Sequence, residues 1–406
     1  MRIGLDDVIR ARERIRDATL LSPCPESIPL SELTGARIHC KLECLQRTGS
    51  FKDRGARNAL LLLSDEQRRR GVIAASAGNH ALGLAYQGKL LGVPVTVVMP
   101  TVAPLIKVET CRRMNARVVL HGESFQEARQ HADEMREAEG LTYIHGYDDP
   151  AIIAGQGTVG LEILEQVPDV DVVIAPIGGG GLVAGLALSI GAQKPNVKLI
   201  GVVSEHARCF AEAFAEGHPV PAHNEHTLAD GLAVPQAGDL AFELARSHID
   251  RIEVVSEAQI ALAILRMIEL EKIVLEGAGA TPVAACLSGE IDDVIRGKRV
   301  VLVLSGGNID PMTLSSVMEK GLVADGRLSR FTAVISDRPG GLAAFATLVA
   351  SAGASIRDIS HDRAFGGPDV SAVNVFCVVE TRDHAHIAEL HRVLGKNGVA
   401  IKPPRV

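Results

Sequence analysis

Short apolar runs rich in Val and Ile alternate with segments of helical periodicity through most of the chain. The amphipathic residues 5–18 predict a helix, the punctuated residues 22–35 a loop, and the alternating residues 36–43 a strand. Later runs predict strands at 71–76, 95–99, 116–120, 142–145, 170–175, 197–203, 252–255 and 299–304, with helices at 79–91, 105–114 and 124–139. This α/β alternation implies parallel sheets, and the two groups of runs imply two lobes with a cleft between them.

The pattern changes after residues 321–328. Beyond this break we expect strands and helices in the order β-α-β-β-α, with a last short strand at 399–401 and a loop at 364–369, which is a ferredoxin-like arrangement. The predicted organisation is a large domain at 1–320, for which the motifs below predict catalysis, and a small domain at 329–406. Within the first, the smaller lobe covers roughly 54–148 and the larger lobe 1–53 and 149–320.

Composition and charge narrow the class of protein. The 406 residues carry a net charge of −7 with both signs interspersed, which disfavours nucleic acid as a partner. No apolar stretch is long enough to predict a membrane span and the N-terminus does not read as a targeting segment, so we expect a cytoplasmic protein. The seven cysteines are scattered without a CxxC pair, which predicts reduced, buried thiols.

Four motifs follow predicted strands. The first holds Lys52, which opens a helix beside Arg54; a helix start and a neighbouring cation lower a lysine pKa, as a Schiff-base lysine needs, although a solvated surface lysine is an equal alternative. The second is Ser76-Ala77-Gly78-Asn79-His80, where backbone N–H groups can hold a carboxylate; taken alone, an ordinary helix cap is the better interpretation.

The third motif is the strongest signal for an anion. Gly178, Gly179, Gly180, Gly181 and Leu182 join an apolar strand to a helix, so that the backbone can wrap a phosphate. The motif lacks the lysine of a nucleotide P-loop, and no acidic residue ends the following strand, which argues against a nucleotide-binding oxidoreductase.

The fourth motif places Ser305 at the end of an apolar strand, where its hydroxyl can bond a heterocyclic nitrogen; the simplest alternative is a turn stabilised by that hydroxyl. Together the motifs bring a lysine, a phosphate-binding turn, a polar anchor and a hydroxyl to strand ends facing one cleft. A phosphorylated aldehyde cofactor requires this combination.

These residues resemble a known family. The segments KLECLQRTGSFKDRGARNAL, SAGNHALGLAY, IGGGGLVAG, TLADGLAV, EGAGA and LSGGN follow the order seen in fold type II pyridoxal-phosphate (PLP) enzymes, which share the tryptophan synthase β-like fold. Within them, residues 1–320 resemble threonine dehydratases (threonine ammonia-lyases). The tail, with Ser336-Asp337-Arg338-Pro339-Gly340-Gly341-Leu342, resembles an ACT regulatory domain.

The resemblance implies roles for the candidate residues. Lys52 would hold PLP and remove the substrate's Cα proton, Phe51 would pack on the ring, Asn79 would bond its phenolic oxygen, and Ser305 would face its nitrogen. Gly178 to Leu182 would bind the phosphate, and residues 76–80 the substrate carboxylate. The β-hydroxyl would leave as water, protonated through the phosphate, giving a 2-oxo acid and ammonia. A hydroxyl at the ring nitrogen would favour this elimination over transamination.

Two departures from related enzymes bear on the reaction. Serine racemases carry a second serine where this chain has Ala77, so elimination without racemisation is expected. Many relatives also place a Glu-Pro where this chain has Val203-Ser204, and some of them use that Glu to bind a divalent cation. In this chain Glu205 is two residues displaced. We therefore expect no divalent metal site, while a monovalent cation held by carbonyls is left open.

Several alternatives stay open at this stage. L-serine or threo-3-hydroxyaspartate are alternative substrates on the same scaffold, and an inactive amino-acid sensor is an alternative class that the retained Lys52 disfavours. The tail would bind an amino-acid effector at 337–342, or serve only for association. Either use fits a homodimer or homotetramer.

Overall fold

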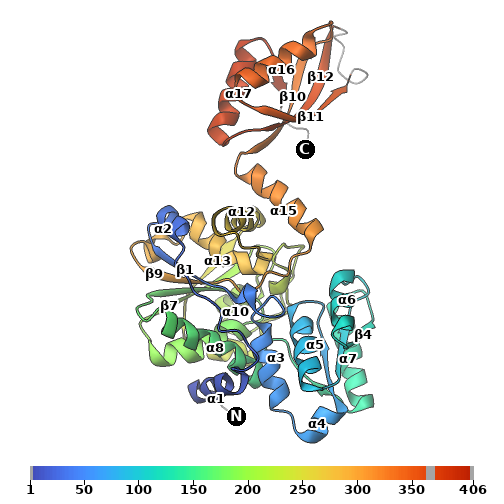
Figure 1. Ribbon diagram of the computed structural model, residues 1–406, viewed down its shortest axis with the longest axis vertical. Coiled ribbons are helices and arrows are strands. Elements are labelled where there is room, and N and C mark those ends of the chain that lie inside the picture. Colours follow the sequence, from blue (N-terminus) through green and yellow to red (C-terminus); the bar gives the residue numbers. More distant parts are fainter. Residues whose placement is uncertain (1–2, 363–370, 403–406) are drawn as a thin grey trace. The chain divides into compact units, whose positions relative to one another are not determined.

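The computed structural model describes residues 3–362 and 371–402 (Figure 1). The chain divides into two compact units, Met1–Thr313 and Leu314–Val406. The expected loop at 364–369 lies outside the described residues.

Two parallel sheets build the first unit. The larger has the order β1-β9-β6-β7-β8, and the smaller the order β4-β3-β2-β5. The strands of the larger sheet are β1 (Arg37–Lys41), β6 (Val172–Pro176), β7 (Lys198–Ser204), β8 (Ile249–Val255) and β9 (Arg299–Val303). Those of the smaller sheet are β2 (Val72–Ala75), β3 (Val95–Met99), β4 (Arg117–Leu120) and β5 (Thr142–Tyr143). The predicted α/β fold with two sheets is thereby confirmed.

Helices cover the sheets of this unit. Around the N-terminal half they are α1 (Leu5–Ile15), α2 (Ile28–Thr34), η1 (Glu43–Leu45), α3 (Lys52–Leu61), α4 (Asp65–Arg70), α5 (Asn79–Leu91), α6 (Leu105–Arg113), α7 (Phe125–Glu139) and α8 (Pro150–Gln166). Further along lie α9 (Gly181–Leu186), η2 (Ala187–Gly191), α10 (Cys209–Glu216), η3 (Asp230–Leu232), α11 (Asp239–Ala245), α12 (Glu257–Arg266), η4 (Met267–Glu271), α13 (Gly277–Ser288) and α14 (Asp292–Ile295). Of these, η2 and η4 are π-helical turns.

Each sheet has its own apolar core. Strands β2, β3 and β6 are buried along their whole length, as expected for parallel strands covered on both faces. One cluster of buried Val, Ile, Leu and Ala surrounds the larger sheet, and another lies around the smaller sheet. The catalytic machinery can therefore be assembled between two separately packed layers.

Helix α8 fixes the position of α3. The two helices approach so closely that a Cβ on Gly155 would lie 2.6 Å from the Cα of Gly55. Only a residue without a side chain fits at such a distance. This contact matters because α3 begins at Lys52.

One local prediction was wrong. The stretch 22–35, expected as a loop, contains the helix α2. Ser27 caps it by accepting a hydrogen bond from the backbone N–H of Leu30 at 3.1 Å, and Gly35 ends it in a left-handed conformation. The Ser, Pro and Gly that punctuate this stretch are thus the start and stop signals of a short helix.

The second unit is a four-stranded antiparallel sheet with two helices. Its elements are β10 (Leu328–Ser336), α16 (Gly341–Ser351), β11 (Ser355–Asp362), β12 (Ala372–Glu380), α17 (His384–Lys396) and β13 (Ala400–Lys402), and the sheet order is β11-β12-β10-β13. This β-α-β-β-α-β order is the ferredoxin-like arrangement expected from the sequence. Helix α15 (Pro311–Ala324) contains the boundary between the units, whereas the sequence placed it between 320 and 329.

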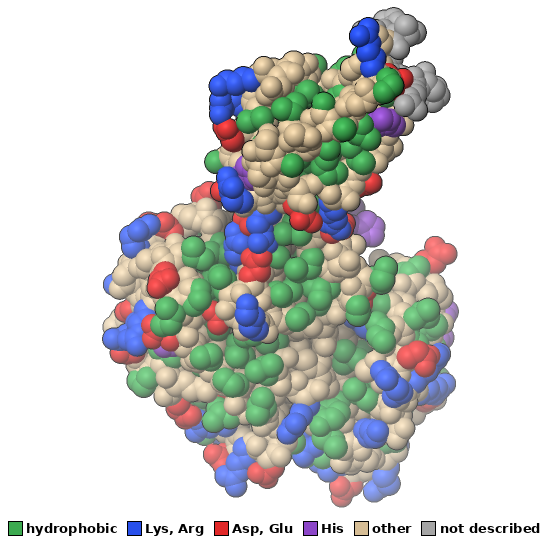
Figure 2. Space-filling view, turned by 45° about the horizontal axis from the view of Figure 1, so that its top comes forward, with side chains coloured by type: hydrophobic (Ala, Val, Ile, Leu, Met, Phe, Trp, Pro, Cys, Tyr) green, Lys and Arg blue, Asp and Glu red, His purple; other side chains and the backbone are tan. Residues whose placement is uncertain are grey.

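Surface and cysteine chemistry add little that is unusual. Acidic and basic side chains intermingle on the face shown in Figure 2. Among the described residues, no helix combines the length and hydropathy that a membrane span requires. All seven cysteines are free; Cys24 and Cys44 are only partly buried, which departs from the expectation that every thiol is buried.

Candidate active site

A cavity of about 350 Å³ collects the sequence-predicted residues. Phe51, Lys52, Ser76, Ala77, Gly78, Asn79, His80, Gly178, Gly179, Gly180, Gly181, Leu182 and Ser305 all line it. The strands β2, β6 and β9 end at this cavity, in agreement with the rule that α/β proteins bind ligands at the carboxyl ends of their strands. The structure therefore brings together motifs that lie far apart in the sequence.

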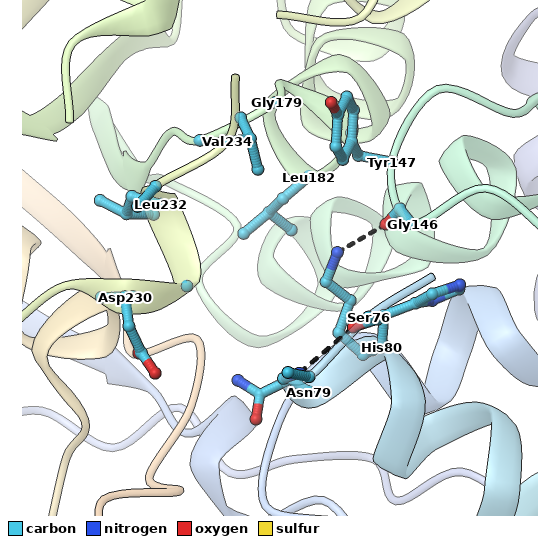
Figure 3. A pocket seen from close by; sticks show the side chains of 18 of the residues that line it. Ser76, Asn79, His80, Gly146, Tyr147, Gly179, Leu182, Asp230, Leu232 and Val234 are labelled. Carbon is cyan, nitrogen blue, oxygen red and sulfur yellow. Dashed lines mark hydrogen bonds between the residues drawn. The ribbon is translucent and has the colours of Figure 1, made fainter. Parts of the chain in front are cut away.

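Lys52 occupies the first position of α3 and is partly buried. Its Nζ donates a hydrogen bond to the backbone carbonyl of Gly146 at 2.6 Å, drawn as a dashed line in Figure 3. Burial lowers the pKa of Lys52 to about 8, although the carboxylate of Glu276 acts in the opposite direction. The protonated form still predominates near physiological pH, but the neutral fraction is far larger than that of an ordinary lysine, whose pKa is about 10.

The turn before Lys52 is closed by Asp53. Its carboxylate accepts hydrogen bonds from the backbone N–H of Thr48 at 3.0 Å and from the hydroxyl of the same residue at 2.5 Å. Burial raises the pKa of Asp53 to about 6 in spite of these two bonds. The TGSFKD motif thus folds back on itself and fixes the start of α3.

A buried ion cluster lies behind the lysine. Arg54 donates to Glu43 at 2.7 Å and to Glu162 at 2.6 Å, and its side chain is 1% exposed. Lys41 donates to the other oxygen of Glu162. Because each charge has an opposite partner, the cluster ties β1, η1, α3 and α8 together without an unpaired buried ion.

The glycine turn between β6 and α9 borders the opposite part of the cavity. Gly180 has φ +96°, which favours glycine, and a Cβ on Gly179 would overlap the ring of Tyr147. The labelled side chains in Figure 3 show Tyr147 and Leu182 beside Gly179. A side chain at Gly179 would therefore displace Tyr147 from the turn.

Asn79 is held by two neighbours. Its Nδ2 donates to Glu276 Oε1 at 2.6 Å, and its Oδ1 accepts from Asn308 Nδ2 at 2.8 Å. Burial raises the pKa of Glu276 to about 7, and the nearby Asp230 acts in the same direction. This carboxyl group is therefore close to its titration point at neutral pH.

The remaining predicted residues make fewer specific contacts. Ser76 Oγ accepts from the backbone N–H of Gly78 at 3.2 Å, and the backbone carbonyl of Ser305 accepts from the N–H of Phe51 at 3.0 Å. His80 is buried, and burial lowers its pKa to about 3. The imidazole is therefore neutral near neutral pH, and its Nε2 donates to the carbonyl of Ile144 at 3.0 Å.

Sequence reasoning missed the segment from His145 to Tyr147. The carbonyl of Gly146 accepts from Lys52, and the Tyr147 ring covers the glycine turn. His145 Nδ1 accepts from the backbone N–H groups of Tyr147 and Asp148 at 3.3 and 2.9 Å, which leaves the proton on Nε2. The available signal was the position of this segment directly after β5.

Glu276 and an ion pair across the cavity were also missed. Lys107 of α6 donates to Asp230 of η3 at 2.9 Å, and both residues line the cavity. Glu276 precedes α13, and EGAGA carried the family resemblance without a role for its first residue.

The residues present fit PLP. A partly buried lysine with a lowered pKa can react with an aldehyde, and the glycine turn, packed against Tyr147, Phe210 and Leu232 where a Cβ would overlap them, lines the cavity with backbone suited to a phosphate. The cavity is large enough for a small cofactor and lies against both features.

The described residues contain no cluster of His, Cys, Asp and Glu suited to a metal ion. In the region where relatives place a cation-binding Glu, the hydroxyls of Ser204 and Thr227 donate to Glu257 at 2.8 and 2.6 Å. The side-chain oxygen atoms of these three residues are therefore already hydrogen-bonded to one another. Glu205 accepts from the backbone N–H of Glu257 at 2.9 Å.

The site and fold define a PLP enzyme, and comparison with known proteins agrees. Residues 15–306 match the family described as "Pyridoxal-phosphate dependent enzyme". The chain belongs to this family, and PLP is its cofactor. It is 42% identical to the L-threonine ammonia-lyase of Thermotoga maritima over 98% of this chain and 99% of that protein. It is 44% identical to the catabolic L-threonine dehydratase TdcB of Escherichia coli K12, over 78% of this chain and 96% of that one.

Solved structures show the same fold. The processed form of threonine deaminase isoform 2 from Solanum lycopersicum has a TM-score of 0.75 and 38% identity, covering 79% of this chain and 87% of that one. Maize serine racemase also has a TM-score of 0.75, with 34% identity, covering 80% and 99%. The fold type II assignment made from the sequence is confirmed.

Proposed function

We propose that the protein deaminates L-threonine to 2-oxobutanoate and ammonia by eliminating the β-hydroxyl as water, with L-serine as a slower substrate. The observation that carries this proposal is the similarity to an L-threonine ammonia-lyase over 98% of the chain, together with a cavity that holds every predicted site residue. Bound PLP supplies a sink for the electrons released at the substrate α-carbon.

The chain's own residues then have separate tasks. Lys52 would hold the cofactor, and its Nζ in the neutral form would accept the proton from the substrate α-carbon. The backbone of Gly178 to Leu182 would hold the phosphate, Phe51 would pack on the ring, and Ser305 would bond the ring nitrogen. These assignments rest on the placement of all these residues around one cavity.

We assign the substrate carboxylate to the start of α5. Ser76, Ala77 and Gly78 precede this helix, and Asn79 and His80 begin it, where the first backbone N–H groups of a helix suit a carboxylate. Ala77 has no group that could return a proton to the opposite face of the substrate. Dehydration without racemisation is therefore expected.

The charges around the cavity favour threonine and serine over threo-3-hydroxyaspartate. Within the described part of the chain, three Lys or Arg side chains line the cavity: Lys52, Lys107 and Arg129. Lys52 is used by the cofactor, Lys107 pairs with Asp230, and Arg129 pairs with Asp133 at 2.9 Å. A second substrate carboxylate would compete with Asp230 or Asp133 for a cation.

The test is the release of 2-oxo acid from L-threonine, L-serine and L-threo-3-hydroxyaspartate by the purified protein. We expect threonine to react fastest, hydroxyaspartate slowest, and Lys52→Ala to be inactive. A yellow protein that releases no oxo acid from any of the three would leave the cofactor in place and refute the reaction. Such a protein would instead fit the inactive amino-acid sensor.

We propose that residues 329–406, within the second unit, form an ACT domain that binds an amino-acid effector at Asp337 to Leu342. Gly340 precedes α16 with φ +90°, and the first N–H groups of this 11-residue helix suit a carboxylate. The full chain would be assayed with each common amino acid. Leu342→Glu, which adds a negative charge at the helix start, should weaken the response, whereas Thr347→Glu, further along α16, should not.

A cytoplasmic homodimer or homotetramer is also part of the proposal. The oligomeric state is proposed from the family resemblance. The location is proposed from the same resemblance, and none of the described helices has the length and hydropathy of a membrane span. Light scattering of the protein as it elutes from a size-exclusion column measures its oligomeric state. A monomer at working concentration would contradict the proposed assembly.

A further inference from the structure

The side-chain amide of Asn79 is held from two sides by residues of two other motifs. Glu276, at the start of EGAGA, accepts from Nδ2 at 2.6 Å, and Asn308, at the end of LSGGN, donates to Oδ1 at 2.8 Å. The backbone N–H of Asn308 also donates to the Glu276 carboxylate. The three side chains form a closed arrangement at the cavity wall.

These contacts fix which way the amide points. A flipped Asn79 would set its oxygen against the carboxylate and its NH₂ against another NH₂, so two good hydrogen bonds would become two repulsive contacts. Asn308 cannot flip to compensate, because its Nδ2 also donates to the backbone carbonyl of Thr48 at 2.6 Å. The orientation of one amide is therefore determined by the other.

Two glycines make room for this arrangement. A Cβ on Gly49 would overlap the amide of Asn308, and a Cβ on Gly306 would overlap the carboxylate of Glu276 and lie 3.3 Å from Asn79 Nδ2. Both glycines belong to the motifs around the cavity. The absence of a side chain at these two positions therefore leaves space for the side chains of Asn308 and Glu276.

We propose that Glu276 and Asn308 are positioning residues, which keep the second N–H of Asn79 directed at the phenolic oxygen of bound PLP. An amide NH₂ has two hydrogens, and Glu276 takes one of them. The other has no acceptor within the part of the chain that the structure describes. This inference rests on the cofactor placement proposed above and adds what holds the donor in place.

The proposal predicts a change in the pKa of the lysine–cofactor linkage, and this change can be measured without substrate. The ring oxygen is most negative after the lysine–cofactor linkage has lost its proton, so a donor to that oxygen stabilises the deprotonated form. The visible spectrum of the resting holoenzyme reports this proton. Loss of an oriented donor should raise the pH midpoint of the spectral change by about one unit.

The experiment is a double-mutant cycle on the holoenzyme with Asn79→Ala and Asn308→Asp. In the Asn308→Asp variant a carboxylate would set an acceptor against Asn79 Oδ1 and release the amide. We expect each single change to raise the midpoint. When Asn79 is already Ala, Asn308→Asp should add only the effect of its own charge, and Asn308→Ala should add nothing. A general structural effect of changing Asn308 would instead persist undiminished in the Asn79→Ala background.

Asn308→Ala serves as a second variant in case the buried carboxylate prevents folding, and the melting temperature of each variant reports its folding. Midpoints unchanged in folded Asn308 variants, or an unchanged midpoint in Asn79→Ala, would overturn the proposal. Since the spectrum needs bound cofactor but no turnover, failure to deaminate threonine is recorded separately in the same preparations.

Discussion

Lys52 Nζ lies 2.6 Å from the carbonyl oxygen of Gly146, at the wall of the cavity. The carbonyl holds the amine in place, and burial destabilises its charged form, which lowers its pKa to about 8. Gly146, which the sequence analysis did not identify as a candidate, thus positions Lys52, the first candidate residue.

This pKa predicts how fast the apoenzyme captures PLP at different pH. Only the neutral amine attacks an aldehyde, so the capture rate should rise with pH and level off above about pH 8 rather than above about pH 10. Stopped-flow absorbance measures the rate. A rate that keeps rising through about pH 10 would show an ordinary, solvated lysine.

Glu276→Gln supplies a matched test of the electrostatics. The carboxylate of Glu276 raises the pKa of Lys52, so its neutralisation should move the midpoint of PLP capture to lower pH. A midpoint that stays in place would mean that Glu276 is already neutral there, against the value of about 7 for its own pKa.

Gly179→Ala should weaken cofactor binding. The added methyl would overlap the ring of Tyr147, so the ring or the phosphate-binding turn has to move. We expect the PLP dissociation constant to increase at least about tenfold. Gly395→Ala in α17, whose Cβ would meet open space, is the control and should bind PLP like the parent. Equal affinity for both variants would contradict a tight turn.

Much of the fold and most of the site could be predicted from the sequence, because the relevant signals are local. The bounds of α5 and β3 agree with the predicted ones, since apolar runs and helix starts mark them directly. Residues that open helices after strands, such as Lys52 and Asn79, were found because parallel strands bring their carboxyl ends to one edge.

The rest depended on contacts that no local pattern encodes. Gly146 matters through a backbone carbonyl, which every residue has. Glu276 is a buried carboxylate whose partner, Asn79, lies 197 residues away in the sequence. Helix α2 was missed because its seven residues are too few to display a helical period.

Arg54→Ala should destabilise the first unit strongly, by about 3–5 kcal/mol, because it leaves Glu43 and Glu162 without their shared cation. Arg10→Ala, which removes an exposed pair with Asp7, should cost less than about 1 kcal/mol. Urea unfolding midpoints compare the two variants. Similar midpoints would show that the buried cluster contributes little.

The same cluster predicts a dependence on pH. Burial alone would raise the pKa of Glu43, but the charge and hydrogen bonds of Arg54 hold it below its usual value. The stability that this carboxylate contributes is therefore present above its unfolded pKa of about 4 and is lost as pH falls through the lower folded value. Without Arg54 the buried carboxyl groups can protonate readily, so the stability gap between parent and Arg54→Ala should narrow in acid. A gap that is constant with pH would place the effect in packing instead.

Ser305→Asp should change which products form. Ser305 is 2% exposed and lines the cavity where the ring nitrogen of PLP is proposed to lie. A carboxylate there would keep that nitrogen protonated, so negative charge would be stored in the ring for longer and reprotonation would compete with loss of the hydroxyl. We expect a larger fraction of turnovers to end in transamination, measured as loss of the yellow cofactor per oxo acid released. Ser305→Ala removes the hydroxyl without adding charge and should lower PLP affinity with no increase in this fraction. Identical partitioning in the Ser305→Asp variant and the parent would show that the group at this position does not control the reaction's outcome.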